Sequence, residues 1–294
     1  MAAVAGSVDA SEPASGPDSM PAQLLTASLL PIHVAGVGPQ VRLPSMQGYD
    51  STSYGEAFAD VYDEWYGDIT DVGATVDALA RLSSIDPSLP VVELGVGTGR
   101  LAVPLADVVH PTPVIGIDSS PAMLERLAAK AATHPVDARL GDMVDALPDG
   151  PLGVVFVAFN TFFNLASRER QVECFRAVGS RLGAEGRFVI EAYVPDEAAR
   201  TGSHVELRTM AADRVVLSVG RYDERTSSAE GQFIELTEHG GVRLRPWSVR
   251  YVTPAELDEM AAACGLCLVD RWETFAGEAY SADSDRHVST YGRR

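Results

Sequence analysis

The 294-residue sequence is poor in cysteine, with only Cys174, Cys264 and Cys267. Three cysteines are too few for a disulfide framework, and they indicate a reducing compartment, for which we expect the cytoplasm. Cys264 and Cys267 form a CxxC pair, but a helix that ends before Gly265 should make the two side chains point in different directions. Because there is no second cysteine pair and no cluster of histidines, the sequence predicts no metal site.

Basic residues are also scarce, since 23 Lys and Arg stand against 41 Asp and Glu, for a formal net charge of −18. Such a field repels phosphate backbones and anionic lipid surfaces, so the composition disfavours nucleic acid and membrane surfaces as partners. The acidity can equally serve solubility alone, and it therefore selects no substrate. The hydrophobic fraction of 46% is that of an ordinary globular protein, and the length suits one large domain or one domain with an insertion.

Long hydrophobic runs are absent as well. The apolar patch at residues 24–37 is interrupted by a proline and a histidine, whereas a membrane span needs about 20 apolar residues. A secretory signal is disfavoured because Arg42 is the only basic residue among the first 45. The sequence predicts a disordered leader over residues 1–45, and it leaves open whether translation starts at Met1 or Met46.

Residues 91–99, VVELGVGTG, form the most informative segment of the chain. An apolar strand is followed by Gly95, Gly97 and Gly99, which allow a sharp turn with exposed backbone amides at the start of a helix. A dinucleotide-binding GxGxxG fingerprint would need a glycine at Arg100, so the segment keeps only GxGxG. By itself the pattern is also compatible with a simple strand-to-helix turn.

A second strand and helix follow at a spacing that suggests a nucleoside. Residues 114–117, VIGI, predict a buried strand that ends at Asp118, and Ser120 and Pro121 then begin a helix. A carboxylate at this strand end can accept hydrogen bonds from both ribose hydroxyls. Dinucleotide sites use the same device, so Asp118 indicates a ribose without identifying the cofactor.

Two further segments, RLGDM at residues 139–143 and FNTFFNL at 159–165, follow in order. Together with the glycine-rich turn and the acidic strand end, they resemble the four motifs of class I S-adenosylmethionine-dependent methyltransferases over roughly residues 55–195. The resemblance implies that Met123 faces the adenine, although a core methionine is an equal alternative, and that Asp142 accepts from the adenine amino group. The cofactor-binding residues that it implies are Tyr62, Glu93, Gly95, Gly97, Gly99, Asp118, Ser119, Met123, Asp142, Met143 and Phe159.

The fourth motif narrows the resemblance. The (D/N)PP(Y/F) sequence of enzymes that methylate planar bases is replaced by NTF at residues 160–162, which is similar to actinobacterial methyltransferases of natural products and amino sugars. In such enzymes an N-terminal helix, here residues 54–66, folds over the cofactor. The resemblance implies that Tyr54 and Tyr62 from this helix meet Phe162 beside the transferred methyl group, as the catalytic positioning residues.

The expected fold is α/β and Rossmann-like, with a seven-stranded sheet. Residues 203–250 predict three or four antiparallel strands, inserted after the fifth strand as a lid over the acceptor, with turns at 212–213, 227–231 and 239–241. A helix that begins with the capping sequence TPAE and two strands, at about 266–275 and 287–292, should complete the sheet. The expected division is a leader at 1–45, a cofactor-binding core at 46–195, the lid at 196–252 and the C-terminal completion of the core at 253–294.

The resemblance implies an enzyme that methylates a small-molecule natural-product acceptor, most closely an amine in antibiotic biosynthesis. The positions of Tyr54, Tyr62 and Phe162 are similar to those in lincosamide N-methyltransferases, and amino-sugar N,N-dimethyltransferases share the inserted lid. Two alternatives stay open: an O-methyltransferase with a base such as His204, which is otherwise an exposed lid residue, and a regulatory protein that binds the cofactor without catalysis. An exposed lid strand leaves a homo-oligomer open.

Overall fold

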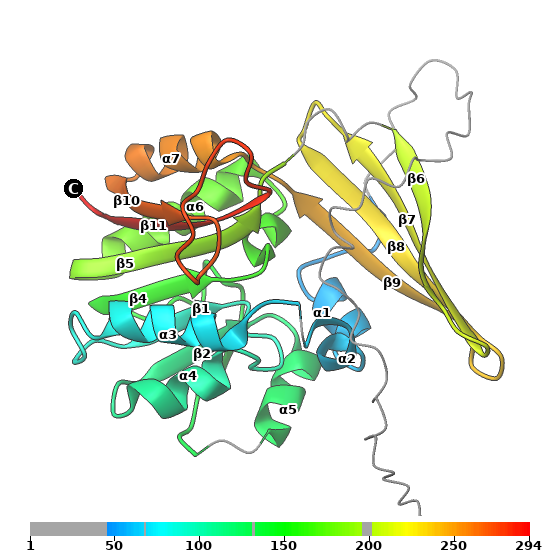
Figure 1. The fold of residues 1–294 in the computed structure, drawn as a ribbon, viewed down its shortest axis with the longest axis horizontal. Coiled ribbons are helices and arrows are strands. Elements are labelled where there is room, and N and C mark those ends of the chain that lie inside the picture. The colour runs from blue at the N-terminus through cyan, green and yellow to red at the C-terminus, as the bar shows by residue number, and fades with distance from the viewer. Residues whose placement is uncertain (1–45, 68, 131–132, 196–201) are drawn as a thin grey trace, which may run out of the picture.

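The computed structural model describes residues 46–67, 69–130, 133–195 and 202–294 (Figure 1). The leader expected at residues 1–45 lies outside the described residues. In the part that is described, no helix is long and apolar enough to cross a membrane.

The core is a seven-stranded sheet with the order β10-β11-β5-β4-β1-β2-β3, which confirms the predicted Rossmann-like architecture. Neighbouring strands are parallel except that β11 runs antiparallel to both β5 and β10. The fifth strand begins at Leu182, where it pairs with Leu152. The strands are β1 (Val91–Leu94), β2 (Val114–Asp118), β3 (Asp137–Leu140), β4 (Leu152–Val157), β5 (Leu182–Tyr193), β10 (Leu266–Trp272) and β11 (Arg286–Arg293).

Helices cover both faces of this sheet, with α3, α4 and α5 on one face and α6 and α7 on the other (Figure 1). The predicted caps are confirmed: Ser120 accepts from the Met123 amide, and Thr253 and Glu256 form a reciprocal capping box. The helices are α3 (Val72–Ser83), α4 (Ala102–Val109), α5 (Pro121–Ala129), α6 (Arg168–Arg181) and α7 (Pro254–Ala263).

The N-terminal helix is not continuous as expected, because it is divided into α1 (Ser53–Phe58) and α2 (Tyr62–Tyr66). Arg245 donates a hydrogen bond to the carbonyl oxygen of Ala57. That oxygen would otherwise accept from the amide of Val61, which bonds to the carbonyl of Phe58 at 3.0 Å instead. A residue almost 190 positions away therefore ends the first helix.

A separate four-stranded antiparallel sheet, which we call sheet B, follows β5 and has the order β6-β7-β8-β9. Its third strand begins at Ser228, so the turn expected at 227–231 lies a few residues earlier in the chain. Figure 1 shows α1 and α2 between sheet B and the core. The strand β9 contacts both α1 and the short helix η2 (Thr161–Asn164). The strands of sheet B are β6 (Ser203–Met210), β7 (Arg214–Asp223), β8 (Ser228–Thr237) and β9 (Gly241–Arg250).

The two faces of sheet B differ. The inner face packs on the helices and the core, and it includes the buried side chains of Val216, Ala229, Glu235 and Arg245. The outer face alternates with it along each strand and leaves apolar side chains exposed. These side chains are Val205, Leu207, Met210, Leu236, Val242 and Leu244.

Candidate active site

The glycine-rich turn leaves the carboxyl end of β1 and enters α4. Gly95, Gly97 and Gly99 have φ values of 72°, 55° and 77°, a region that favours glycine. The amides of Gly95 and Val96 both donate to the carbonyl of Ile117, at 2.8 and 2.9 Å, so the turn is fixed to the end of β2. A Cβ at Gly95 would collide with Thr161, so the fourth motif also packs directly on this turn.

Asp118 joins the first two motifs. One carboxylate oxygen accepts from the amide of Gly97 at 2.8 Å, and the other accepts from the amide of Ser120 at 2.9 Å. Burial raises the pKa of this carboxyl above its ordinary value, and the hydrogen bonds from the backbone amides act in the opposite direction. The position suits a carboxylate that accepts from ribose hydroxyls next to the turn.

Glu93, in β1, places a buried carboxyl group below the turn. Its side chain is only 4% exposed, and its Oε2 atom is buried without a hydrogen-bond partner in the described part of the chain. Burial raises the pKa of this carboxyl to about 8, against the lowering effect of the Arg100 guanidinium. A buried acceptor without a donor fits the ammonium group of a bound amino acid, such as the methionine part of S-adenosylmethionine.

Helices α1 and α2 are fixed to the cofactor motifs by two carboxylates. Glu56 accepts from the hydroxyl of Ser120 at 2.8 Å and from the amide of Ala122 at 3.1 Å. Asp63 accepts from the hydroxyl of Thr98 at 2.6 Å and forms an ion pair with Lys130 at 3.0 Å. The N-terminal segment therefore closes over the glycine turn, as the resemblance implied.

This closure brings Tyr62 to the turn, and Tyr54 packs in the same cluster. A Cβ at Gly97 would lie 3.9 Å from Tyr62 and 4.0 Å from the sulfur of Met123, so both side chains border the turn. Tyr54 stacks on Phe58 with ring centroids 4.3 Å apart. Burial raises the pKa values of Tyr54 and Tyr62, so both phenols stay protonated at neutral pH and offer a hydroxyl and a ring rather than a base.

Phe162 is placed differently from the expectation. Its ring is completely buried and packs edge-on against Phe175 of α6, with centroids 5.6 Å apart. The aromatic residue of the fourth motif that does meet the N-terminal helices is Phe159, whose ring lies 5.9 Å from that of Tyr66. Phe159 and Asn160 have φ values of 48° and 66°, and this left-handed turn separates the two phenylalanines onto opposite sides.

Glu191 holds that turn, and the sequence analysis missed it. Its carboxylate accepts from the amide of Phe159 at 2.9 Å, while the side-chain oxygen of Asn160 accepts from the amide of Tyr193 at 2.7 Å. Burial raises the pKa of Glu191 above its ordinary value. A single acidic residue within the apolar strand sequence RFVIEAYV was the signal that could have identified it.

The remaining expected cofactor residues lie around the ends of β2 and β3. Ser119 donates its hydroxyl to the carbonyl of Ser51 at 2.6 Å. The Oδ1 atom of Asp142 accepts from Arg170 at 2.7 Å and from the amide of Val144 at 2.8 Å. Met143 is partly buried against the core. These contacts fix the residues in place, and their roles toward adenosine remain predictions.

His204 lies on the inner face of sheet B and is partly buried, not exposed. Its ring stacks on Tyr222 with centroids 5.4 Å apart, and its Nδ1 atom is buried without a partner among the described residues. The thiols of Cys264 and Cys267 contact different carbonyls, those of Val172 and Gly292, as the sequence suggested. In the described ranges, no group of three or more metal-ligating side chains is found.

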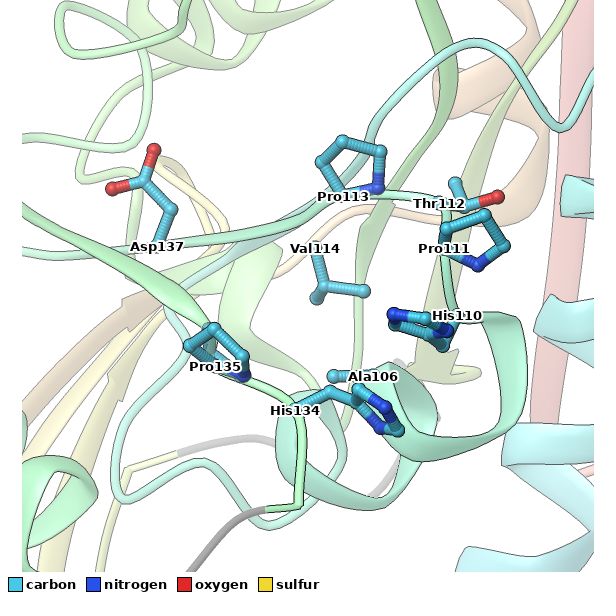
Figure 2. A pocket seen from close by; sticks show the side chains of 10 residues that line it. Ala106, His110, Pro111, Thr112, Pro113, Val114, His134, Pro135 and Asp137 are labelled. Carbon is cyan, nitrogen blue, oxygen red and sulfur yellow. The ribbon is translucent and has the colours of Figure 1, made fainter.

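A cavity of about 340 Å³ lies at the other edge of the sheet, next to the amino ends of β2 and β3. Figure 2 shows the rings of His110 and His134 side by side at its wall, and their centroids are 3.9 Å apart. The glycine turn follows the carboxyl end of β1, so this cavity is separate from the candidate site.

Four features define a class I S-adenosylmethionine-dependent methyltransferase. They are the sheet order, the glycine turn, the acidic residues Glu93 and Asp118, and the N-terminal segment that closes over the turn. Comparisons with known proteins agree. A family model described as a methyltransferase domain matches residues 91–186. The structure of the CcbJ methyltransferase from Streptomyces caelestis shares 39% identity and a TM-score of 0.75, with 83% of this chain and 99% of that chain covered. The chain belongs to the S-adenosylmethionine-dependent methyltransferases.

More distant solved structures share the fold. The sugar N-methyltransferase KedS8 from Streptoalloteichus is 16% identical, with 88% of this chain and 99% of that chain covered and a TM-score of 0.59. The amino pentose methyltransferase CalS10 from Micromonospora echinaspora is 19% identical, with 80% and 97% covered and a TM-score of 0.59. Among curated proteins, no sequence matches this chain.

Proposed function

We propose that this enzyme transfers the methyl group of S-adenosylmethionine to an amine nitrogen of a small natural-product acceptor in antibiotic biosynthesis. The observation that supports an amine is the chemistry around the turn: the phenol of Tyr62, which borders Gly97, and that of Tyr54 in the same cluster stay protonated. A free amine needs no strong base to attack, whereas a hydroxyl does. An acceptor of the lincosamide or amino-sugar type fits this proposal.

S-adenosylmethionine, when bound, supplies a methyl group that is activated by a sulfonium. Glu93 and the turn amides hold its amino-acid part, Asp118 holds the ribose, and Met123 and Asp142 contact the adenine. These roles follow the geometry of the turn and the buried, unpartnered oxygen of Glu93.

Positioning is the main contribution of the protein to the rate, because methyl transfer needs an in-line approach of the nucleophile at roughly 3 Å. Aromatic rings suit this task, since they exclude water and attract a sulfonium without becoming methylated themselves. We assign the wall beside the methyl group to Tyr54, Tyr62 and Phe159. Phe162, which the resemblance placed there, instead packs in the core against Phe175 and supports the fourth motif from within.

One observation favours a second candidate function. The Nδ1 atom of His204 is buried on the inner face of sheet B without a partner among the described residues. A histidine in that state can accept a proton from a hydroxyl, so O-methylation with His204 as the base is the alternative. The domain division at residues 46–195, 196–252 and 253–294 and a cytoplasmic location are part of the proposal. Self-association is also proposed, supported by the exposed apolar side chains on the outer face of sheet B.

The test is to measure S-adenosylhomocysteine formed from S-adenosylmethionine by the full chain with a panel of secondary amines, amino sugars and phenols. Methylated amines identified by mass spectrometry would support N-methylation. Turnover of hydroxyl acceptors alone would support the alternative and overturn the proposal. Binding of the cofactor without turnover of any acceptor would favour a regulatory binding protein.

A further inference from the structure

One residue of sheet B breaks the regular pairing of β6 with β7. Leu207 pairs with Leu217 and Thr209 pairs with Val216, so Arg208 is an extra residue between two consecutive pairs. Bulges are common next to active sites. Arg208 lies on the inner face of sheet B with His204 and Glu206, and its side chain reaches the rings of α2.

The guanidinium of Arg208 lies in a frame of three aromatic rings. Its central carbon is 4.6 Å from the ring centroid of Trp65, 4.7 Å from that of Phe233 and 5.4 Å from that of Tyr66. A guanidinium held over ring faces keeps its N–H edge available for a planar acceptor group.

This frame adjoins the candidate site. The ring of Tyr66 lies 5.0 Å from that of Tyr62, which borders Gly97. The same ring lies 5.9 Å from that of Phe159. Arg208 is therefore separated from the glycine turn by two aromatic rings.

Charge distinguishes Arg208 from the other arginines around these helices. Across the described residues, Arg208 has no ion pair and no hydrogen bond. The three other arginines of sheet B beside these helices, Arg214, Arg243 and Arg245, all form ion pairs with carboxylates. The pairs are Arg214–Glu64, Arg214–Glu235, Arg243–Asp60, Arg245–Asp60 and Arg245–Glu235.

We propose that Arg208 is a specificity-determining residue that binds a carboxylate, or another oxyanion, of the methyl acceptor. This inference rests on the proposed function and refines it: the acceptor is an amine that carries a negative group away from the nitrogen to be methylated. A chain with a net charge of −18 repels anions, so an anionic acceptor needs a dedicated cation at its site. A planar guanidinium suits a carboxylate because it donates two parallel hydrogen bonds.

The experiment uses matched pairs of probes on the full chain loaded with S-adenosylhomocysteine. The amine pairs are 6-(methylamino)hexanoic acid and 4-piperidinebutyric acid with their methyl esters, in which the carboxylate lies several bonds from the nitrogen, and the hydroxyl pair is 4-hydroxybenzoate with its methyl ester. Calorimetry gives the affinity of each acid relative to its ester, and S-adenosylhomocysteine formation gives the same ratio for turnover with S-adenosylmethionine. Esterification also changes the basicity of the amine, but this change is the same for every variant, so it cancels when the ratios are compared between variants.

The variants separate charge from packing. Arg208→Met keeps an apolar stem among the rings and removes the donors, while Arg208→Lys keeps the charge without the planar fork. Arg225→Met is the matched control, because Arg225 lies in the exposed turn after β7 and pairs with Asp223. Melting temperature and cofactor affinity show that each variant is folded.

We expect the wild type to prefer acid over ester by about 10- to 100-fold, as for a charge-assisted hydrogen bond. Arg208→Met should abolish the preference, Arg208→Lys should retain part of it, and Arg225→Met should keep all of it. Equal binding of acid and ester by the wild type, failure of every acid to bind, or an unchanged ratio in Arg208→Met would overturn the inference. Methylated amines without an acid preference would overturn it while leaving the proposed function intact. An acid preference seen only with hydroxyl acceptors would overturn N-methylation and leave the anion-binding role of Arg208 intact.

Discussion

The carboxylate of Asp118 accepts a hydrogen bond of 2.8 Å from the backbone amide of Gly97, and it thereby connects the two strand ends that would hold the nucleoside. We predict that Asp118→Ala weakens S-adenosylmethionine binding by about 1.5–3 kcal/mol, the usual contribution of a hydrogen bond to a charged group. Calorimetric titration measures the change. Asp137→Ala is the control, since Asp137 is exposed and pairs only with Arg139 among the described residues. Unchanged affinity in Asp118→Ala would remove Asp118 from the ribose site.

Glu93 predicts a pH dependence of stability. Its pKa in the folded protein is about 8, above the ordinary value of 4.5, so the folded state holds a proton that the unfolded state has lost between these pH values. The stabilisation is therefore complete below about pH 4.5 and is lost as the pH rises through about 8, by at most ~1.4 kcal/mol per pH unit. Urea unfolding at intervals from pH 5 to 8 should show a smaller loss in Glu93→Gln. Parallel curves for the two proteins would contradict the assignment.

Glu191 predicts a coupled effect on stability and turnover. Glu191→Ala leaves the amide of Phe159 without its acceptor and frees a turn of two left-handed residues. We expect a loss of about 1–3 kcal/mol in the free energy of unfolding and a lower kcat, with cofactor affinity less affected. Glu191→Gln, which retains a side-chain oxygen, should restore most of both. Turnover that stays at the wild-type level in Glu191→Ala would show that the turn needs no such support.

Phe162 should behave as a core residue. Because its ring is completely buried against Phe175, Phe162→Ala should cost about 3–5 kcal/mol in the free energy of unfolding. Phe162→Leu, which fills most of the volume, should cost less than about 1.5 kcal/mol. Denaturant unfolding measures both. A stable Phe162→Ala protein with lost turnover would instead indicate that this ring lies beside the transferred methyl group.

Arg245 should be essential for the attachment of sheet B. It is 1% exposed, donates to Asp60 at 2.7 Å and to Glu235 at 2.8 Å, and also bonds the Ala57 carbonyl. Arg245→Met leaves two carboxylates without their main partner, and we expect a loss of about 3–5 kcal/mol in unfolding experiments.

Two further variants make that prediction specific. Arg243→Met should cost less than about 1 kcal/mol, since the side chain of Arg243 is 53% exposed although it pairs with the same aspartate. Adding Asp60→Asn and Glu235→Gln to Arg245→Met should recover part of the loss, because neutral amides are less costly to leave buried. Equal losses for Arg243→Met and Arg245→Met would argue against a buried clamp.

The features that the sequence predicted correctly are those encoded locally. The alternation of apolar strands with capped helices gave the sheet, because caps such as Ser120 and Thr253 act within one helical turn. The glycines and Asp118 were recognisable because backbone freedom and a carboxylate at a strand end are properties of single positions.

The features that were missed depend on distant partners. The break between α1 and α2 is caused by Arg245, and the local sequence YGEAFADVYDEWY contains no proline that would break the helix. The side to which Phe159 and Phe162 turn depends on two left-handed residues that Glu191 supports from the next strand. The aromatic frame of Arg208 combines rings from α2 and β8. A pattern of residue types carries none of this information.

Helices α1 and α2 are fastened to the donor motifs through Glu56 and Asp63, and to sheet B through Asp60. One short segment thus contacts the proposed sites of both substrates. If bound S-adenosylmethionine raises the affinity for the acceptor by some factor, the acceptor must raise the affinity for S-adenosylmethionine by the same factor. A segment that contacts both sites would couple the departure of S-adenosylhomocysteine to that of the methylated product.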